Sequence, residues 1–232
     1  MVPALLYLLA SSVPEAALMH TAVGTALAAI IFTSISSVRA HHRHGAIHWD
    51  YFKKLTPTVL LGAFSGALLT KVMSFDFMRL FFAVFEFAVA AIMYFGLSSS
   101  SHAQHLRQWV WRLTGYIIGL VSAIVGIGGG TMTTPFLTYN QVAIKNAIAT
   151  SAAVGMPIAV SGALGFVVAG LGVESATGGL GFIHLQALIS IVVASVLFAP
   201  LGAKVAHQVD GKKLKKFFAL FLAALGVSVL SF

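Results

Sequence analysis

Hydrophobic segments long enough to cross a lipid bilayer recur along the whole chain, and no other feature constrains the fold as strongly. A water-facing surface could not be covered with polar groups, because 59% of the residues are hydrophobic and only 9% are charged. The sequence therefore predicts an all-α integral membrane protein with no sizeable soluble domain. The expected hydrophobic segments are 2–12, 20–38, 56–72, 79–97, 110–139, 146–169, 183–203 and 215–231.

The two halves of the chain resemble each other, because short motifs of the first half return in the same order in the second. These motifs are VPALLY and TPFLTY at 2–7 and 134–139, TAVGTA and NAIATS at 21–26 and 146–151, and Ile-His at 47–48 and 183–184. We therefore predict two membrane repeats. The expected divisions are a first repeat at 1–97, a connecting loop at 98–109 and a second repeat at 110–232. Since nothing in the first repeat matches 109–134, we expect that repeat to be N-terminally incomplete.

The segment 110–139 is interrupted by three adjacent glycines, Gly128 to Gly130, and by Pro135. Both residue types are unfavourable inside a helix. Non-helical backbone at membrane depth is tolerated only where it is buried in protein or lines a cavity. We predict that the chain enters the membrane, bends at the glycines and returns. Tight helix packing through small residues is the alternative, but it usually requires glycines spaced four apart.

The basic residues indicate how the segments are threaded. If every segment crossed the membrane once, six lysines and arginines would lie on one side and eight on the other. If 110–139 returns, twelve lie on one side and only Lys71 and Arg79 on the other. The positive-inside rule favours the second arrangement, which gives the repeats inverted orientations. The twelve are Arg39, Arg43, Lys53, Lys54, Arg107, Arg112, Lys145, Lys204, Lys212, Lys213, Lys215 and Lys216.

A helix that restarts after the glycines would point its free amides and its positive dipole end into the cavity, where an anion is favoured. The candidate substrate-binding residues are Gly128, Gly129, Gly130, Thr131, Thr133, Asn146, Thr150 and Ser151, with Thr21 and Thr25 from the first repeat. For a single threonine or serine, a hydroxyl bonded back to its own helix is the favoured interpretation. For the repeated Thr-[Ser/Ala] pattern, both interpretations stay open.

Two titratable residues are candidates for proton coupling. His20 precedes a threonine-rich helix and could carry a proton or face the anion, although a histidine at the membrane interface is the simpler alternative. Glu86 lies midway in its segment, where a carboxylate is expensive and is therefore a functional hypothesis. Pairing of Glu86 with a neighbouring helix is its structural alternative. The histidines at 41–48 stand in a basic region that opposes cation binding, so we predict no metal site and no cofactor.

The sequence resembles the TauE/SafE family of membrane transporters, the sulfite exporters. The residues that carry the resemblance are GIGGGTMTTPFL at 126–137, AIATSA at 147–152, HTAVGTALAAI at 20–30 and GAIHWDYF at 45–52. The resemblance implies export or uptake of small sulfur-containing anions such as sulfite, sulfoacetate or related sulfonates, and we expect export. We expect a multi-pass transporter of the cell (inner) membrane that is not an enzyme. Its partners would be this substrate and the lipid bilayer, with no nucleic acid.

Three alternatives stay open at this point. The substrate could be another small anion, such as a carboxylate. The chain could be a truncated, non-transporting member of the family, since it lacks the first glycine-rich segment that members normally carry. A membrane enzyme would need a cluster of titratable residues at one depth, and Glu86 is the only clearly mid-segment carboxylate. Assembly into a homo-oligomer is compatible with the sequence.

Overall fold

The computed structural model describes residues 1–95, 107–172, 179–195 and 211–232, the last with side chains from 216 onward. Its helices are α1 (Val2–Leu9), α2 (Glu15–Arg43), α3 (Trp49–Thr70), α4 (Phe75–Phe95), α5 (Gln108–Val125), α6 (Gly130–Tyr139), α7 (Ile144–Ala169) and α9 (Gly211–Leu230), with a short apolar helix at Leu185–Ser195. The described part of the chain contains no β-strand. Four helices, α2, α4, α5 and α7, are long and apolar enough to cross a membrane. The predicted all-α membrane protein is confirmed.

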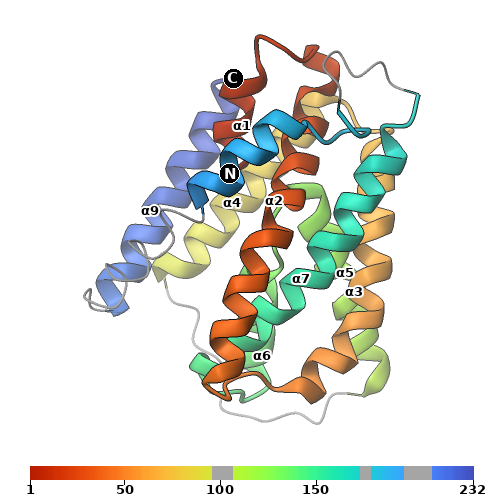
Figure 1. The fold of residues 1–232 in the computed structure, drawn as a ribbon. Coiled ribbons are helices and arrows are strands. Elements are labelled where there is room, and N and C mark those ends of the chain that lie inside the picture. Colours follow the sequence, from red (N-terminus) through yellow and green to blue (C-terminus); the bar gives the residue numbers. More distant parts are fainter. Residues whose placement is uncertain (96–106, 173–178, 196–210) are drawn as a thin grey trace.

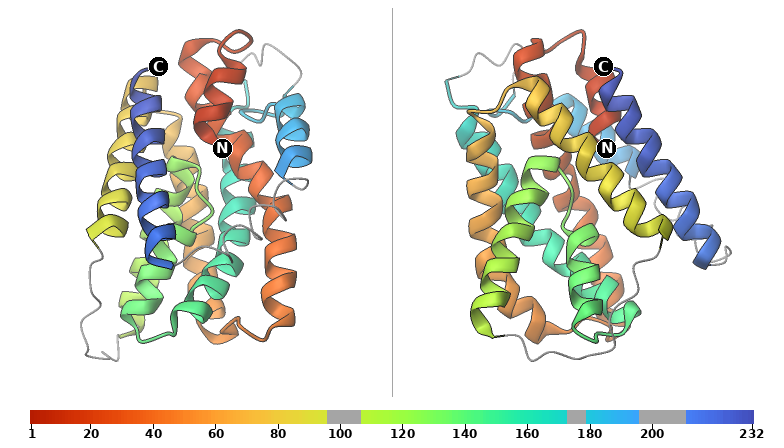
Figure 2. Two further views of the ribbon diagram at one scale, coloured as in Figure 1. Left: turned by 90° about the vertical axis from the view of Figure 1, so that its left-hand side faces the viewer. Right: turned by 180° about the vertical axis from the view of Figure 1, so that it is seen from behind.

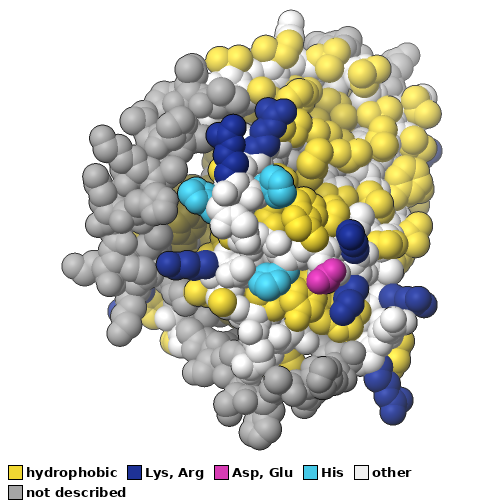
Figure 3. Space-filling view, turned by 60° about the horizontal axis from the view of Figure 1, so that its bottom comes forward, with side chains coloured by type: hydrophobic (Ala, Val, Ile, Leu, Met, Phe, Trp, Pro, Cys, Tyr) yellow, Lys and Arg dark blue, Asp and Glu magenta, His cyan; other side chains and the backbone are white. Residues whose placement is uncertain are grey.

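The helices form a bundle in which the long elements run between two ends (Figure 1). We call one of them the basic end; there α2 connects to α3, α5 begins, and α6 connects to α7. At the opposite end, α3 turns into α4 and α7 ends (Figure 2). Helices α4 and α9 pack together as a tilted pair along one side of the bundle. Figure 3 shows the basic end, where lysine, arginine and histidine side chains gather around uncharged surface that is bordered by hydrophobic side chains.

Helices α3 and α5 are held at very short range by glycines on both partners. A Cβ atom at Gly62 would collide with the carbonyl oxygen of Tyr116, and one at Gly119 would collide with that of Val59. Gly66 stands one turn further along α3, so this helix carries the G-x-x-x-G spacing that favours close helix contact in membranes. Gly62 and Gly66 are therefore packing residues, because a Cβ atom at either one would meet the backbone of α5.

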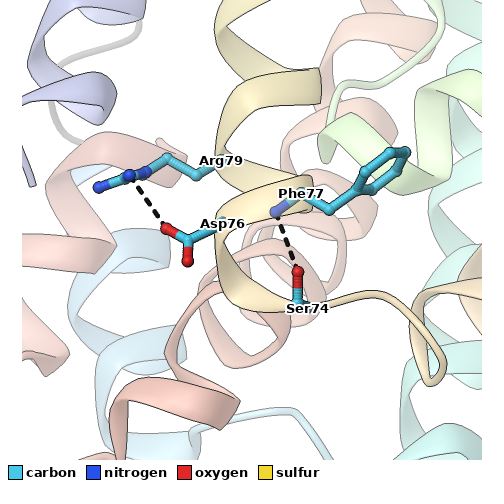
Figure 4. A network of polar contacts seen from close by, with 4 residues as sticks. All are labelled: Ser74, Asp76, Phe77 and Arg79. Atoms are coloured by element: carbon cyan, nitrogen blue, oxygen red, sulfur yellow. Dashed lines mark hydrogen bonds and ion pairs between the residues drawn. The ribbon is translucent and has the colours of Figure 1, made fainter.

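The start of α4 shows how the opposite end is arranged (Figure 4). The side chain of Ser74 accepts a hydrogen bond of 3.2 Å from the amide of Phe77, which caps the helix. One turn into the helix, Asp76 pairs with Arg79 at 3.0 Å. The charge of Arg79 is therefore largely balanced within its own helix.

Two of the predicted loops are shorter in the structure than the sequence suggested. The stretch 39–55 was expected to be a loop, but α2 continues to Arg43 and α3 already begins at Trp49. Polar residues continue a helix beyond the hydrocarbon core without penalty, and basic groups in its last turn interact favourably with the helix dipole. Gln108 and Trp109 were expected in the connecting loop and belong instead to α5. Most of that loop lies outside the described residues, as do residues 196–203 of the expected segment 183–203.

Candidate functional site

The hydrophobic segment 110–139 is broken at its glycines. Helix α5 ends at Val125, and Gly126 follows with a φ of +77°. Gly129 has a φ of +69° and precedes the first residue of α6. Side chains disfavour this left-handed conformation, which explains why glycines occupy both positions. Figure 2 shows α5 rising from the basic end and α6 returning to it. The predicted interruption at the glycines is confirmed.

The break lies deep in the bundle and touches elements from both halves of the chain. A Cβ atom at Gly126 would lie 2.9 Å from the side chain of Val2 in α1, and one at Gly128 would lie 3.1 Å from Ile30 in α2. On the other side, a Cβ atom at Gly155 of α7 would collide with the carbonyl oxygen of Gly128. The glycine at 155 therefore lets α7 approach the backbone of the break directly.

The first turn of α6 presents backbone amides that have no protein partner in the described part of the chain. The amide of Gly130 donates to the carbonyl of Gly128, and that of Thr133 donates to Gly129, each at 2.9 Å. Between them, the amides of Thr131 and Met132 donate no such bond among the described residues. A Cβ atom added at Gly130 would meet no atom within 4 Å. Free amides beside open space at a helix N-terminus can bind an anion.

A buried hydroxyl accompanies these amides. Thr133 is 0% exposed, and its Oγ1 atom has no hydrogen-bond partner among the described residues. A Cβ atom at Gly129 would lie 3.7 Å from this oxygen, so the hydroxyl faces the break. Leaving a buried hydroxyl unpaired costs about 1–3 kcal/mol. Such a group requires an explanation, and a ligand that bonds to it is one.

The predicted site residues on α7 lie nearer the basic end. Ser151 donates to the carbonyl of Ile148 at 2.9 Å, so its oxygen accepts the proton of Thr134 across a 2.7 Å contact. This contact joins α6 to α7. Thr134 was missed from the sequence, because a single threonine gives no signal that distinguishes it from its neighbours. Asn146 is half-buried in the first turn of α7 and is not beside the glycines.

Thr25 and Thr150 bond to the opposite halves of the chain. The buried hydroxyl oxygen of Thr25 accepts a hydrogen bond of 3.0 Å from the amide of His184. The hydroxyl oxygen of Thr150 accepts a hydrogen bond of 2.9 Å from the amide of His48. The sequence analysis paired these two threonines and these two histidines as equivalent positions of the repeats. The two hydrogen bonds are therefore related by exchange of the halves.

The remaining predicted residues lie away from the first turn of α6. Thr21 donates to the carbonyl of Ala17 at 2.8 Å, as the alternative of a bond to its own helix predicted. The Nε2 atom of His20 lies 2.8 Å from the carbonyl oxygen of Thr70, at the opposite end of the bundle. Its ring stacks on Phe182 with centroids 4.9 Å apart. These contacts tie α2 to the end of α3 and to the segment that follows α7.

Glu86 is buried in α4, with only 4% of its surface exposed. Among the described residues its carboxyl group makes no ion pair, so its role in proton coupling stays a prediction.

Comparison with known proteins agrees with this architecture. A family model described as "Sulfite exporter TauE/SafE" matches residues 1–229. The chain is 35% identical over 231 residues to a "Probable membrane transporter protein" of Haemophilus influenzae, covering 98% of this chain and 88% of that protein. It is 26% identical over 223 residues to "Probable membrane transporter protein YdhB" of Bacillus subtilis, covering 91% of this chain and 85% of that protein. No solved structure matches.

The family match extends over nearly the whole chain, and the relatives are described as transporters. Helices that could cross a membrane and an interrupted segment deep in the bundle are what such a protein requires. The protein therefore belongs to the TauE/SafE family of sulfite exporters, and it is a multi-pass membrane transporter rather than an enzyme.

Proposed function

We propose that this transporter exports a small sulfur-containing anion, such as sulfite, sulfoacetate or a related sulfonate, across the inner cell membrane. The observation that carries the proposal is the first turn of α6, where the amides of Thr131 and Met132 and the hydroxyl of Thr133 lack protein partners among the described residues. A sulfite or sulfonate group has three acceptor oxygens. Several neutral donors suit such a group, and a substrate held without a fixed opposite charge can also be released.

The proposed mechanism relies on the two inverted repeats. Transporters of this design bind substrate near the middle of the membrane, where the repeats meet, and open alternately to each side. The crossed hydrogen bonds of Thr25 and Thr150 support such a relation between the halves, since each half accepts from the matching position of the other. A membrane potential that is negative inside drives an anion outward, by about 2.3 kcal/mol per charge at 100 mV.

Transport by the purified chain in proteoliposomes tests the proposal. Labelled sulfite would be loaded inside, a potential imposed, and its release followed with and without excess sulfoacetate or acetate. We expect release that sulfoacetate inhibits and acetate does not. Equal inhibition by acetate would instead identify a carboxylate permease. If the chain reconstitutes in its folded state but moves none of these anions, the proposal is wrong.

A further inference from the structure

A cavity of about 430 Å³ lies between the N-terminal parts of α3 and α5, at the basic end. Both helices begin there, so their positive dipole ends point toward the same region. The cavity is lined mainly by Lys53, Lys54, Thr58, Gln108, Trp111 and Arg112. None of these residues belongs to the glycine break, so the proposed transport function does not account for the cavity.

Three cations meet at this cavity, and no carboxylate of the described residues lines it. Among the described residues, none of the three forms an ion pair, whereas Arg79 at the opposite end pairs with Asp76. Asp50 lines a neighbouring cavity of about 330 Å³ together with Lys54 but makes no ion pair with that lysine. Like charges held close together repel each other, so an anion in the cavity would relieve the repulsion.

The ammonium group of Lys54 is held in place by aromatic rings. Its nitrogen lies 5.6 Å from the ring centroid of Tyr51 and 5.7 Å from that of Trp111. The two rings stack on each other, with centroids 5.2 Å apart and an interplanar angle of 13°. Because the rings restrict Lys54, less side-chain entropy is lost when it binds a ligand. The side-chain amide of Gln108 adds a neutral donor to the same space, whereas the Thr58 hydroxyl donates to the carbonyl of Leu55 at 3.0 Å.

The tryptophans place this cavity at the level of the lipid headgroups. All three tryptophans of the chain, Trp49, Trp109 and Trp111, lie in the first turns of α3 and α5. Trp49 is 39% exposed and Trp109 is 60% exposed. Tryptophans gather where the hydrocarbon meets the headgroups. A ligand at this depth is therefore more readily supplied by the membrane than by bulk water.

We propose that this cavity binds the phosphate group of an anionic phospholipid, with Lys53, Lys54 and Arg112 as its cationic ligands. Basic cavities between membrane helices bind lipid headgroups in this way. The planar guanidinium of Arg112 can donate two parallel hydrogen bonds to phosphate oxygens, while the lysines act as point charges. The bound lipid would join α3 to α5 at the end where both helices begin.

Native mass spectrometry of the full, delipidated chain tests this inference. The protein would be titrated with phosphatidylglycerol and, separately, with phosphatidylcholine. We expect preferential retention of phosphatidylglycerol, weakened about fivefold for each cation removed in Lys53→Gln and Arg112→Gln and about 25-fold in the double variant. Lys145→Gln is the matched control, because Lys145 is exposed at the same end but does not line the cavity. Retention by the variants equal to that of the unchanged protein would overturn the proposal.

A second arm identifies the source of the phosphate. Inorganic phosphate in excess should not displace the bound phosphatidylglycerol, because the acyl chains hold the lipid in the membrane layer. Displacement by inorganic phosphate would overturn the lipid assignment in favour of a soluble anion. If the double variant does not fold, retention of phosphatidylglycerol by Lys53→Gln alone tests the proposal. Lys53 is exposed, so its replacement should leave the fold intact. The measurement needs no transported substrate, so its outcome does not depend on the proposed export of sulfur anions.

Discussion

At the scale of single residues, Thr133 differs from the other threonines near the glycine break. Thr21 donates to its own helix, Thr134 donates to Ser151, and Thr25 accepts from His184. The Thr133 hydroxyl is buried, and within the described residues it has no partner. A protein that gained only stability from this residue would carry valine there, since valine has the same shape without the unpaired polar group.

We therefore expect Thr133→Val to separate stability from transport. The free energy of unfolding should stay the same or rise by about 1 kcal/mol, because an unpaired buried hydroxyl is removed. Transport of sulfite should fall about tenfold or more, since a hydrogen bond to a charged substrate is lost. Thermal unfolding in detergent and release from proteoliposomes measure the two effects.

Thr33→Val provides the control for this prediction. Its hydroxyl donates to the carbonyl of Ile30 in the same helix at 3.1 Å. The same chemical change there should leave transport unaltered. Full transport by Thr133→Val would show that this hydroxyl does not contact the substrate.

At the scale of elements, glycines serve two different purposes in neighbouring helices. In α5, Gly119 allows the backbone of α3 to approach, and an added Cβ atom would lie 2.8 Å from the amide nitrogen of Ala63. In α6, Gly130 faces open space. The sequence alone distinguishes the two purposes poorly, because spacing reveals a packing glycine only when the partner helix is known.

Alanine substitutions should separate these purposes. Gly119→Ala should lower the free energy of unfolding by about 1–3 kcal/mol, because the methyl group meets backbone atoms that cannot yield. Gly130→Ala should preserve stability or raise it by up to about 1 kcal/mol, because alanine favours the helix. Transport of sulfite by the Gly130→Ala variant should nevertheless fall, since the methyl group occupies the space beside the free amides of Thr131 and Met132. Thermal unfolding and release from proteoliposomes would be measured for both variants. Normal transport by Gly130→Ala would contradict the assignment of the space beside Gly130 to the substrate.

At the scale of the whole molecule, the return of 110–139 to the basic end determines how every later segment is threaded. The chain contains no cysteine, so single cysteines can be introduced and labelled from either side of the membrane. We expect Arg107→Cys and Gln141→Cys to react from the same side and Val72→Cys from the other, because α5 and α6 form one re-entrant pair. Val72 is 81% exposed, and Arg107 and Gln141 are also exposed. Labelling of 107 and 141 from opposite sides would show that the segment crosses the membrane.

The crossed hydrogen bonds give a second prediction at this scale. Thr25→Val and Thr150→Val should each lower the free energy of unfolding by about 1–3 kcal/mol, because each leaves a backbone amide without its acceptor. Their effects should be nearly equal and nearly additive, as for equivalent and separate sites. Thr25→Ser and Thr150→Ser keep the hydroxyl and should restore most of the stability in thermal unfolding. An effect at only one of the two positions would argue against a symmetric relation of the repeats.

The membrane character, the all-helical fold and the position of the break could be predicted from the sequence, because they depend on local properties. Hydrophobic length decides whether a segment can cross the bilayer, and adjacent glycines mark where a helix stops whatever surrounds them. The helix ends were predicted less well. Arg43 and Trp49 extend their helices into the predicted loop, since polar residues near the membrane surface are compatible with either structure.

Only the tertiary structure decided which of the predicted site residues face the break. Thr133, Thr150 and Thr25 look alike in the sequence, yet one hydroxyl is unpaired among the described residues and two accept amides from 102 and 159 residues away. The partner of a hydroxyl is a matter of which distant backbone packs beside it, and no local pattern records that. The same reason explains the basic cavity. Lys53 and Arg112 are far apart in the chain, and they meet because glycines let α3 and α5 pack closely enough to bring the N-terminal parts of both helices together.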